Sequence, residues 1–219
     1  MGAIPDEPRP KPRTLGCSFL IDLIQKTVLE MESGMKTGLL FAMALLLVGI
    51  SSSERGLGVF PEESMPKAHF PTVKASSLEN RELTLPGDFD GARNLVLVAF
   101  EREQQKNVDS WLHKMSQFEE LDTDFRYYEL PTIERMNAFM RWFIDSGMRR
   151  GIPDRKARER TITLYLDKKL FCDALAISDQ KRIYALLVDR QGNVLWRAEG
   201  DYDEDKAASL KSALEAHRR

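Results

Sequence analysis

The feature that most constrains this chain is the run Asn-Leu-Val-Leu-Val-Ala-Phe at residues 94–100, in which six of the seven residues are apolar. The run does not alternate between polar and apolar residues, which is typical of a strand covered on both faces of its sheet. A polar segment, residues 101–108, follows and leads into a helical pattern. Open α/β folds place their sites at the carboxyl ends of such strands, so we expect any chemistry to lie in this segment. It contains no Cys, His, Ser or Gly.

Strand and helix patterns alternate along the rest of the chain. Strands are predicted at residues 70–75, 81–86, 94–100, 125–130, 161–166, 183–188 and 194–199. Helices are predicted at residues 108–118, 132–148, 167–175 and 206–217. The order predicts an α/β fold, a three-layer sandwich whose mixed sheet has parallel core strands, with a C-terminal β-hairpin followed by a helix.

Three local details accompany these elements. Pro131 is predicted to stop the strand at 125–130, because proline cannot donate to a ladder. The three tryptophans are expected to pack in the core or on helix faces. The 132–148 helix is expected to carry one apolar face, formed by Ile133, Met136, Phe139, Met140, Phe143 and Ile144.

The first quarter of the chain reads differently from the rest. Residues 1–34 are rich in proline and charge at their start, and are interpreted as unstructured or as an over-long gene assignment, with Met35 as the start. Residues 35–53 contain a lysine, then an apolar run, and end in small residues. This is the layout of a secretory signal peptide. This predicts a periplasmic or secreted protein. The alternative is a membrane anchor through residues 38–50. Residues 54–69 are a predicted linker, and 70–219 the domain.

Composition excludes several classes of function. The net charge is −2, so no basic field indicates nucleic-acid binding. Cys17 and Cys172 are far apart and the three histidines are scattered, so neither a disulfide framework nor a metal site is predicted, and we expect no cofactor. The acidic residues at 201–205 are expected to cap the last helix rather than to bind calcium.

The order of elements resembles the thioredoxin fold. The hairpin at residues 183–197, Ile-Tyr-Ala-Leu-Leu-Val-Asp-Arg-Gln-Gly-Asn-Val-Leu-Trp-Arg, is similar to that of peroxiredoxins and secreted thiol-disulfide oxidoreductases. Residues 137–153 and 194–200 resemble the ATP synthase assembly factor (ATP ten) family and its bacterial relatives, which lack redox cysteines. The resemblance implies a cysteine-free assembly factor. The leader departs from the Arg-rich transit peptide of the mitochondrial members.

The same resemblance implies where reactive groups would lie. Thioredoxin's cysteine pair would fall at Gln105 and Val108, and neither residue is a thiol. The proline that precedes the hairpin in these enzymes is also missing, because residues 178–183 read Ser-Asp-Gln-Lys-Arg-Ile. Two parts of the redox machinery are therefore absent from the sequence.

These observations predict a redox-inactive binding or assembly protein of the cell envelope that holds a protein partner, which we expect to be membrane-associated. The candidate partner-binding residues are Arg141, Arg149, Arg150, Arg155 and Arg158. Arginine favours bidentate contacts to anionic groups, although a solvated surface explains the cluster as well. The alternative is a divergent thiol-dependent oxidoreductase or peroxiredoxin-like enzyme that uses Cys172. The simpler interpretation of Cys172 is a small buried hydrophobic residue.

Overall fold

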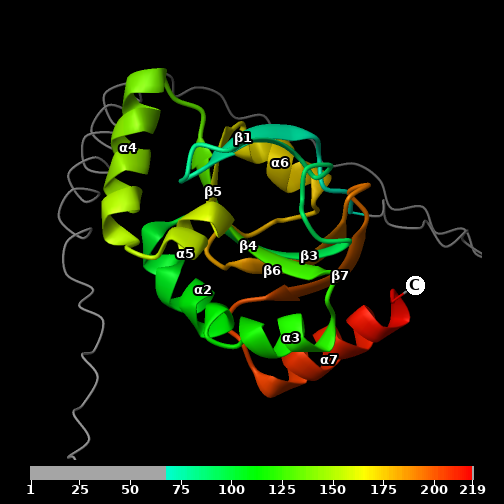
Figure 1. Cartoon of the computed structure of the whole chain (residues 1–219). Helices are drawn as coiled ribbons and strands as arrows, with labels where there is room; N and C mark the ends of the chain where they lie inside the picture. Colours follow the sequence, from blue (N-terminus) through cyan, green and yellow to red (C-terminus); the bar gives the residue numbers. More distant parts are fainter. Residues whose placement is uncertain (1–67, 219) are drawn as a thin grey trace, which may run out of the picture. The chain divides into compact units, whose positions relative to one another are not determined.

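A computed structural model describes residues 68–218 of the chain. A seven-stranded sheet runs through this part, in the order β2-β1-β5-β4-β3-β6-β7 (Figure 1). The strands are β1 (Val73–Ser77), β2 (Glu82–Leu85), β3 (Arg93–Ala99), β4 (Phe125–Glu134), β5 (Ile162–Leu166), β6 (Tyr184–Asp189) and β7 (Val194–Glu199). The helices are η1 (Arg102–Gln104), α2 (Gln105–Leu112), α3 (Met115–Leu121), α4 (Ala138–Gly151), α5 (Arg155–Arg160), α6 (Lys168–Ala174) and α7 (Glu204–Ala216).

The apolar run forms the buried strand β3, as predicted. Its first six residues are buried. It pairs in parallel with β4 and antiparallel with β6. The β4–β5 pair is also parallel, whereas the β6–β7 hairpin and the β1–β2 pair are antiparallel. The predicted mixed sheet with a parallel core and a C-terminal hairpin is confirmed.

The strand β4 runs through Pro131, so the prediction that this proline stops the strand is wrong. Between Phe125 and Pro131 the strand pairs with β3, and from Thr132 to Glu134 it pairs with β5. Pro131 lies opposite Ala99, the last residue of the β3 ladder. A residue without an N–H is tolerated where a ladder ends, and the strand continues because it has a new partner on its other side.

The following helix consequently begins later than predicted. Residues 132–134 belong to β4, and α4 starts at Ala138 after Asn137, whose side chain accepts a hydrogen bond from the Met140 N–H at 3.0 Å. The predicted 108–118 helix is likewise two helices, because α2 ends at Leu112 and α3 begins at Met115.

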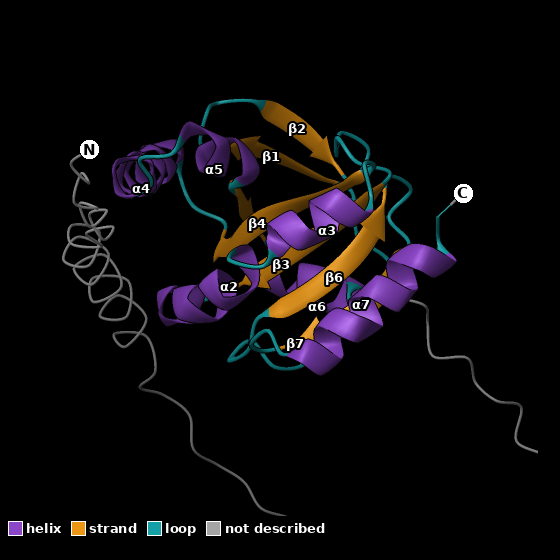
Figure 2. Cartoon of the chain, turned by 60° about the horizontal axis from the view of Figure 1, so that its bottom comes forward, coloured by secondary structure: helices purple, strands orange, loops and turns teal. Residues whose placement is uncertain are grey.

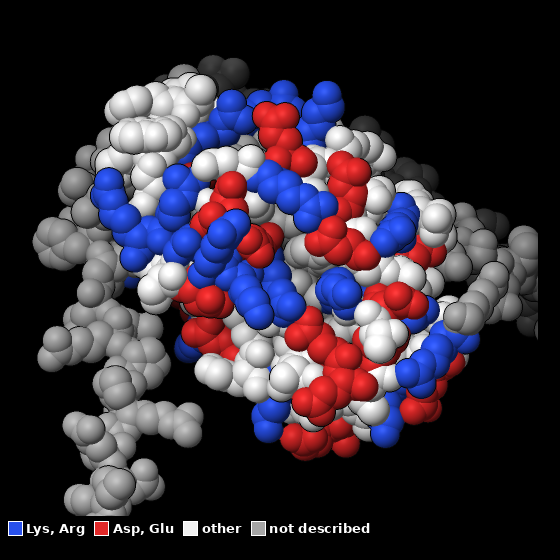
Figure 3. Space-filling view, in the orientation of Figure 1, with Lys and Arg blue, Asp and Glu red and all other residues white. Residues whose placement is uncertain are grey.

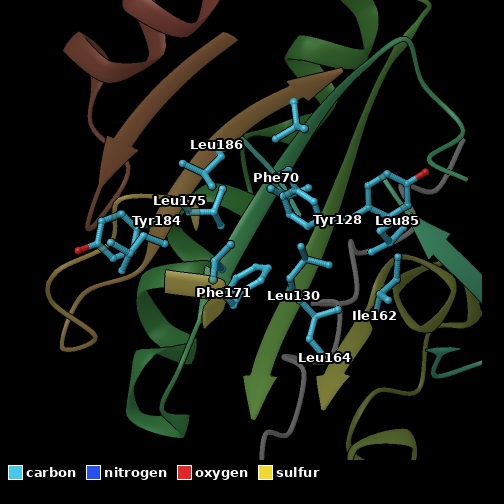
Figure 4. Close-up of a cluster of buried hydrophobic side chains, with 14 of the residues drawn as sticks. Phe70, Leu85, Tyr128, Leu130, Ile162, Leu164, Phe171, Leu175, Tyr184 and Leu186 are labelled. Carbon is cyan, nitrogen blue, oxygen red and sulfur yellow. The ribbon is translucent and has the colours of Figure 1, made fainter. Parts of the chain in front are cut away.

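Two hydrophobic clusters fill the two faces of the sheet. One includes Phe171, Cys172 and Leu175 in and just after α6, packed against β4, β5 and β6 (Figure 4). The other lies beneath α2, α3 and α7, which cover the opposite face (Figure 2). The predicted three-layer arrangement is therefore present. Helix α4 lies to one side of these layers, next to α5, and contains no buried residue.

Two turns are built as their sequences predict. Gly192, with φ +92, closes the β6–β7 hairpin, and a side chain there would need a backbone conformation that L residues rarely adopt. Asp203 accepts a hydrogen bond from the Lys206 N–H at 2.8 Å at the start of α7. This confirms the capping interpretation of the acidic segment.

The predictions for residues 1–34 and 35–53, and for Cys17, lie outside the described residues. So does most of the predicted linker, although His69 already bridges Asn193. From Ala68 to Arg218, no helix is long and apolar enough to cross a membrane.

Candidate functional site

The side chain of Gln104 forms hydrogen bonds with the backbone of the segment that follows β3. This residue is 4% exposed. Its carboxamide oxygen accepts hydrogen bonds from the Phe100 and Glu101 N–H groups at 2.8 and 3.2 Å, and its nitrogen donates to the Gln180 carbonyl at 2.7 Å. The position expected to hold chemistry therefore holds an amide that ties two loops together.

The second loop is the approach to β6. Gln180, besides accepting from Gln104, donates from its side chain to the Cys172 sulfur at 3.6 Å. The Tyr184 hydroxyl donates to the Asp179 carbonyl at 2.7 Å. The bonds of Gln180 fasten the loop to η1 on one side and to α6 on the other.

Cys172 is buried in α6, 3% exposed, within the hydrophobic cluster of Phe171 and Leu175. Burial raises the pKa of its thiol, so the thiolate that thiol chemistry needs is disfavoured. The structure places Cys172 where the simpler sequence interpretation put it, as a small hydrophobic residue.

Two of the five candidate arginines hold the turn between β1 and β2. Arg149 donates from Nε to the Leu78 carbonyl at 2.6 Å and from its guanidinium to Asn80 Oδ1 at 2.8 Å. Arg158 pairs with Glu79 at 2.5 Å, which holds the pKa of that carboxyl below its usual value. These two side chains are therefore engaged within the domain.

The other three arginines have freer positions. Arg155 lies 3.0 Å from Glu159 and 3.8 Å from Glu79, with its side chain 75% exposed. Arg150 is exposed at the end of α4. Arg141 lies in a groove, with its guanidinium 6.0 Å from the centre of the Tyr165 ring. The structure thus brings three of the five arginines, Arg149, Arg155 and Arg158, together around Glu79 and the β1–β2 turn, and leaves Arg141 in the groove and Arg150 exposed.

The groove runs between α4 and the β2–β1–β5 end of the sheet and has a volume of about 680 Å³. The hydrophobic cluster beneath α2, α3 and α7 includes residues of β3, β4, β6 and β7 and none of β1, β2 or β5. Its lining is mainly polar, with Lys74, Ala75, Ser76, Glu82, Leu83 and Thr84 from β1 and β2, Thr163 and Tyr165 from β5, and Ala138, Arg141, Trp142 and Asp145 from α4.

Asp145 and Tyr165 form the polar centre of this groove. The tyrosine hydroxyl donates to the carboxyl group at 2.7 Å. Burial raises the pKa of both side chains. Next to them, Trp142 is 60% exposed, which corrects the expectation that it packs in the core or on a helix face. An acceptor, a guanidinium and an indole side by side are suited to recognising a polar chain segment.

A buried carboxyl group that sequence reasoning missed lies beneath α2. Glu129 in β4 is 7% exposed, and burial raises its pKa to about 7. Gln105 hydrogen-bonds to it and opposes the shift, while Asp109 adds to it. The period of two along β4 could have identified it, since Glu129 shares a face with the buried Phe125.

Within residues 68–218, no group of three or more His, Cys, Asp or Glu side chains is arranged to hold a metal ion.

Similarity to known proteins extends to the fold. The chain is similar to a "putative electron transfer protein" from Aquifex aeolicus VF5, at 8% identity and a TM-score of 0.50, over 70% of this chain and 96% of that one. It is also similar to a thiol:disulfide interchange protein from a Bacteroides species (16% identity, TM-score 0.45, 70% and 90% covered). A third is the exposed lipoprotein thioredoxin of Streptococcus pneumoniae (12% identity, TM-score 0.42, 65% and 98% covered).

No family model and no curated protein matches the chain. At these identities the likeness to solved structures concerns the fold alone. The sheet order, the parallel core strands and the closing hairpin and helix make that fold thioredoxin-like.

Proposed function

We propose that this chain is a non-catalytic, thioredoxin-like binding or assembly protein of the cell envelope, which holds a protein partner in the groove between α4 and the β1–β2 end of the sheet. The observation that carries the proposal is the groove itself, about 680 Å³ with a mainly polar lining. A cavity of that size suits side chains or a short extended segment of a partner.

The arrangement around α2 supports the absence of thiol catalysis. Gln104 occupies the turn after β3, and the only cysteine between residues 68 and 218 is buried in α6. Nucleophilic thiol chemistry needs an accessible thiolate whose pKa is lowered. Cys172 has the opposite environment, which disfavours the alternative of an oxidoreductase that uses this residue.

The groove is favoured over strand addition at the nearby sheet edge. The Thr84 N–H in β2 donates to the Asp88 carboxylate at 2.6 Å, and the Thr84 carbonyl accepts from the Asp88 N–H at 3.1 Å. Backbone groups engaged in this way do not pair with an added strand. Recognition therefore falls to side chains, with Arg141 and Trp142 on one wall and Lys74 and Glu82 on the other.

The resemblance of residues 137–153 to the ATP synthase assembly factors supports a membrane protein as the partner. Those residues include all of α4, which forms one wall of the groove. The signal-peptide layout of residues 35–53 supports an extracytoplasmic location, with an anchored form as the alternative.

A photo-cross-linker placed in the groove tests this proposal. A benzophenone amino acid at Ser76 should yield one defined product with an envelope protein, and the same group at Lys211 on α7 should not. Arg149→Glu is unsuitable as a charge variant in this experiment, because it would also break the β1–β2 turn. Identical products from both positions, or turnover in an insulin-reduction or peroxide-consumption assay, would contradict the proposal.

A further inference from the structure

The polar side of α4 faces the sheet. Arg141, Asp145 and Arg149 recur every four residues, so they form one stripe along the helix. Arg141 lies over Tyr165, Asp145 accepts from the same tyrosine, and Arg149 binds the β1–β2 turn. These contacts fix the rotation of the helix about its own axis.

The aromatic side of α4 consequently faces away from the domain. Phe139 and Phe143 are each two residues from Arg141, which is roughly half a turn around the helix. Phe139 is 68% exposed and Phe143 is half-buried. The rings of Phe139 and the 60% exposed Trp142 lie 6.2 Å apart, centre to centre. A surface helix of a soluble domain normally presents the opposite arrangement, with its apolar stripe toward the core.

The segment that carries this aromatic surface is basic, although Arg158 and Arg160 within it pair with Glu79 and Glu119 outside it. Residues 135–160 contain eight basic and three acidic residues, a net charge of +5, whereas the whole chain carries −2. Arg135, Arg150 and Lys156 are exposed. Figure 3 shows uncharged atoms over the upper part of α4 and a group of basic side chains below them, toward α5.

We propose that this face of α4 binds the surface of a bilayer that contains anionic phospholipids. The aromatic rings would enter the headgroup region. Arg150, in the last turn of a helix about 21 Å long, and Arg135, in the segment that precedes the helix, would lie against lipid phosphates. Aromatic and basic side chains on one helix face are the composition of helices that lie in a membrane interface.

An anionic lipid surface fits these observations better than an acidic protein does. The only acidic residue of α4, Asp145, is turned toward Tyr165 and does not oppose the negative surface. The aromatic rings need an apolar environment that a run of carboxylates does not supply. The groove borders this face, because Trp142 lines the groove while its ring also lies beside Phe139. Phe139, Phe143 and Arg150 do not line the groove.

The test uses the full chain with a single environment-sensitive label. Cys17→Ser and Cys172→Ala remove the native thiols, and Phe139→Cys carries a nitrobenzoxadiazole group. The matched control is Leu170→Cys on α6, where the native side chain is 67% exposed. Each protein is bound to vesicles of phosphatidylcholine alone, or of phosphatidylcholine with about a third phosphatidylglycerol, and quenching by brominated acyl chains is measured.

We expect emission at residue 139 to rise several-fold and to be quenched on anionic vesicles only, with no change at residue 170. Arg135→Gln and Arg150→Gln should each raise the lipid concentration at half-response about fivefold, and Arg150→Lys should not. Equal responses at residues 139 and 170, or equal responses on both kinds of vesicle, would overturn the inference. An equal rise in emission at residue 139 on addition of soluble polyglutamate would also overturn it. So would a rise that accompanies dimer formation in the absence of lipid.

Discussion

At the scale of single residues, the carboxyl group of Glu129 ties the stability of the domain to pH. Its pKa is raised to about 7 in the folded protein, above the usual value of 4.5. Between these values the folded state binds more protons than the unfolded state does. The free energy of unfolding should therefore fall as pH rises through this range, by about 3 kcal/mol for this group alone.

Glu129→Gln should remove that dependence and make the domain more stable than the parent protein above about pH 7. Urea unfolding of both proteins from about pH 5 to about pH 8 measures the difference. Glu134→Gln, on the exposed end of the same strand, is the control and should follow the parent. Parallel curves for the parent and Glu129→Gln would contradict the assignment.

Cys172 provides a second test at this scale. In a Cys17→Ser background, its reaction with Ellman's reagent should be about a hundredfold slower in the folded than in the unfolded protein, because it requires local opening. Cys172→Ser should leave partner binding unchanged. A rapid reaction in the folded state, or a mixed disulfide between Cys172 and a client, would restore the oxidoreductase alternative.

At the scale of elements, two neighbouring arginines of α4 have different roles. Arg149 binds the β1–β2 turn through the Leu78 carbonyl and Asn80, whereas Arg150 is exposed. Arg149→Ala should lower the free energy of unfolding by about 1 to 2 kcal/mol, and Arg150→Ala should change it by less than about 0.5 kcal/mol.

Thermal or urea unfolding of the two variants checks this prediction. The comparison also separates folding from binding, since only Arg150 remains available to a partner or a membrane. Equal losses of stability in both variants would mean that the turn is not held by Arg149.

The elements also show where sequence reasoning reached its limit. The pattern of apolar residues predicted the positions of most strands, because a buried strand such as β3 consists mainly of apolar residues. It did not locate the end of β4, because the exchange of strand partners at Pro131 is a property of the sheet and not of the segment. Nor could it orient α4, since a helical stripe says which residues share a face but not which face meets the sheet.

At the scale of the whole molecule, the fold class followed from the order of elements, but the candidate site did not follow from the motifs. The sequence indicated an empty thiol position and an arginine-rich segment. In the structure, the side chain of Gln104 occupies the empty thiol position. The arginine-rich segment is divided, with some arginines bound to the β1–β2 turn, one in the groove and one exposed. The groove brings together residues from β1, β2, β5 and α4, which no local pattern connects.

The domain thus offers two neighbouring surfaces on α4, a polar groove toward the sheet and an aromatic, basic face, which share Trp142. A protein that assembles partners at a membrane needs both a contact with the partner and a fixed position relative to the bilayer. The net charge of −2 for the whole chain does not indicate the basic segment, because the +5 of residues 135–160 is offset by acidic residues elsewhere in the chain.

Hydrogen–deuterium exchange of the full chain, alone and in its cross-linked partner complex, tests whether the partner binds in the groove between α4 and the β1–β2 end of the sheet. Binding in the groove predicts new protection at residues 74–84 and 138–145. It predicts little change at residues 101–111 and 178–183, where a thioredoxin-type enzyme would hold its substrate. Protection centred on those two loops, with the groove unchanged, would contradict the account.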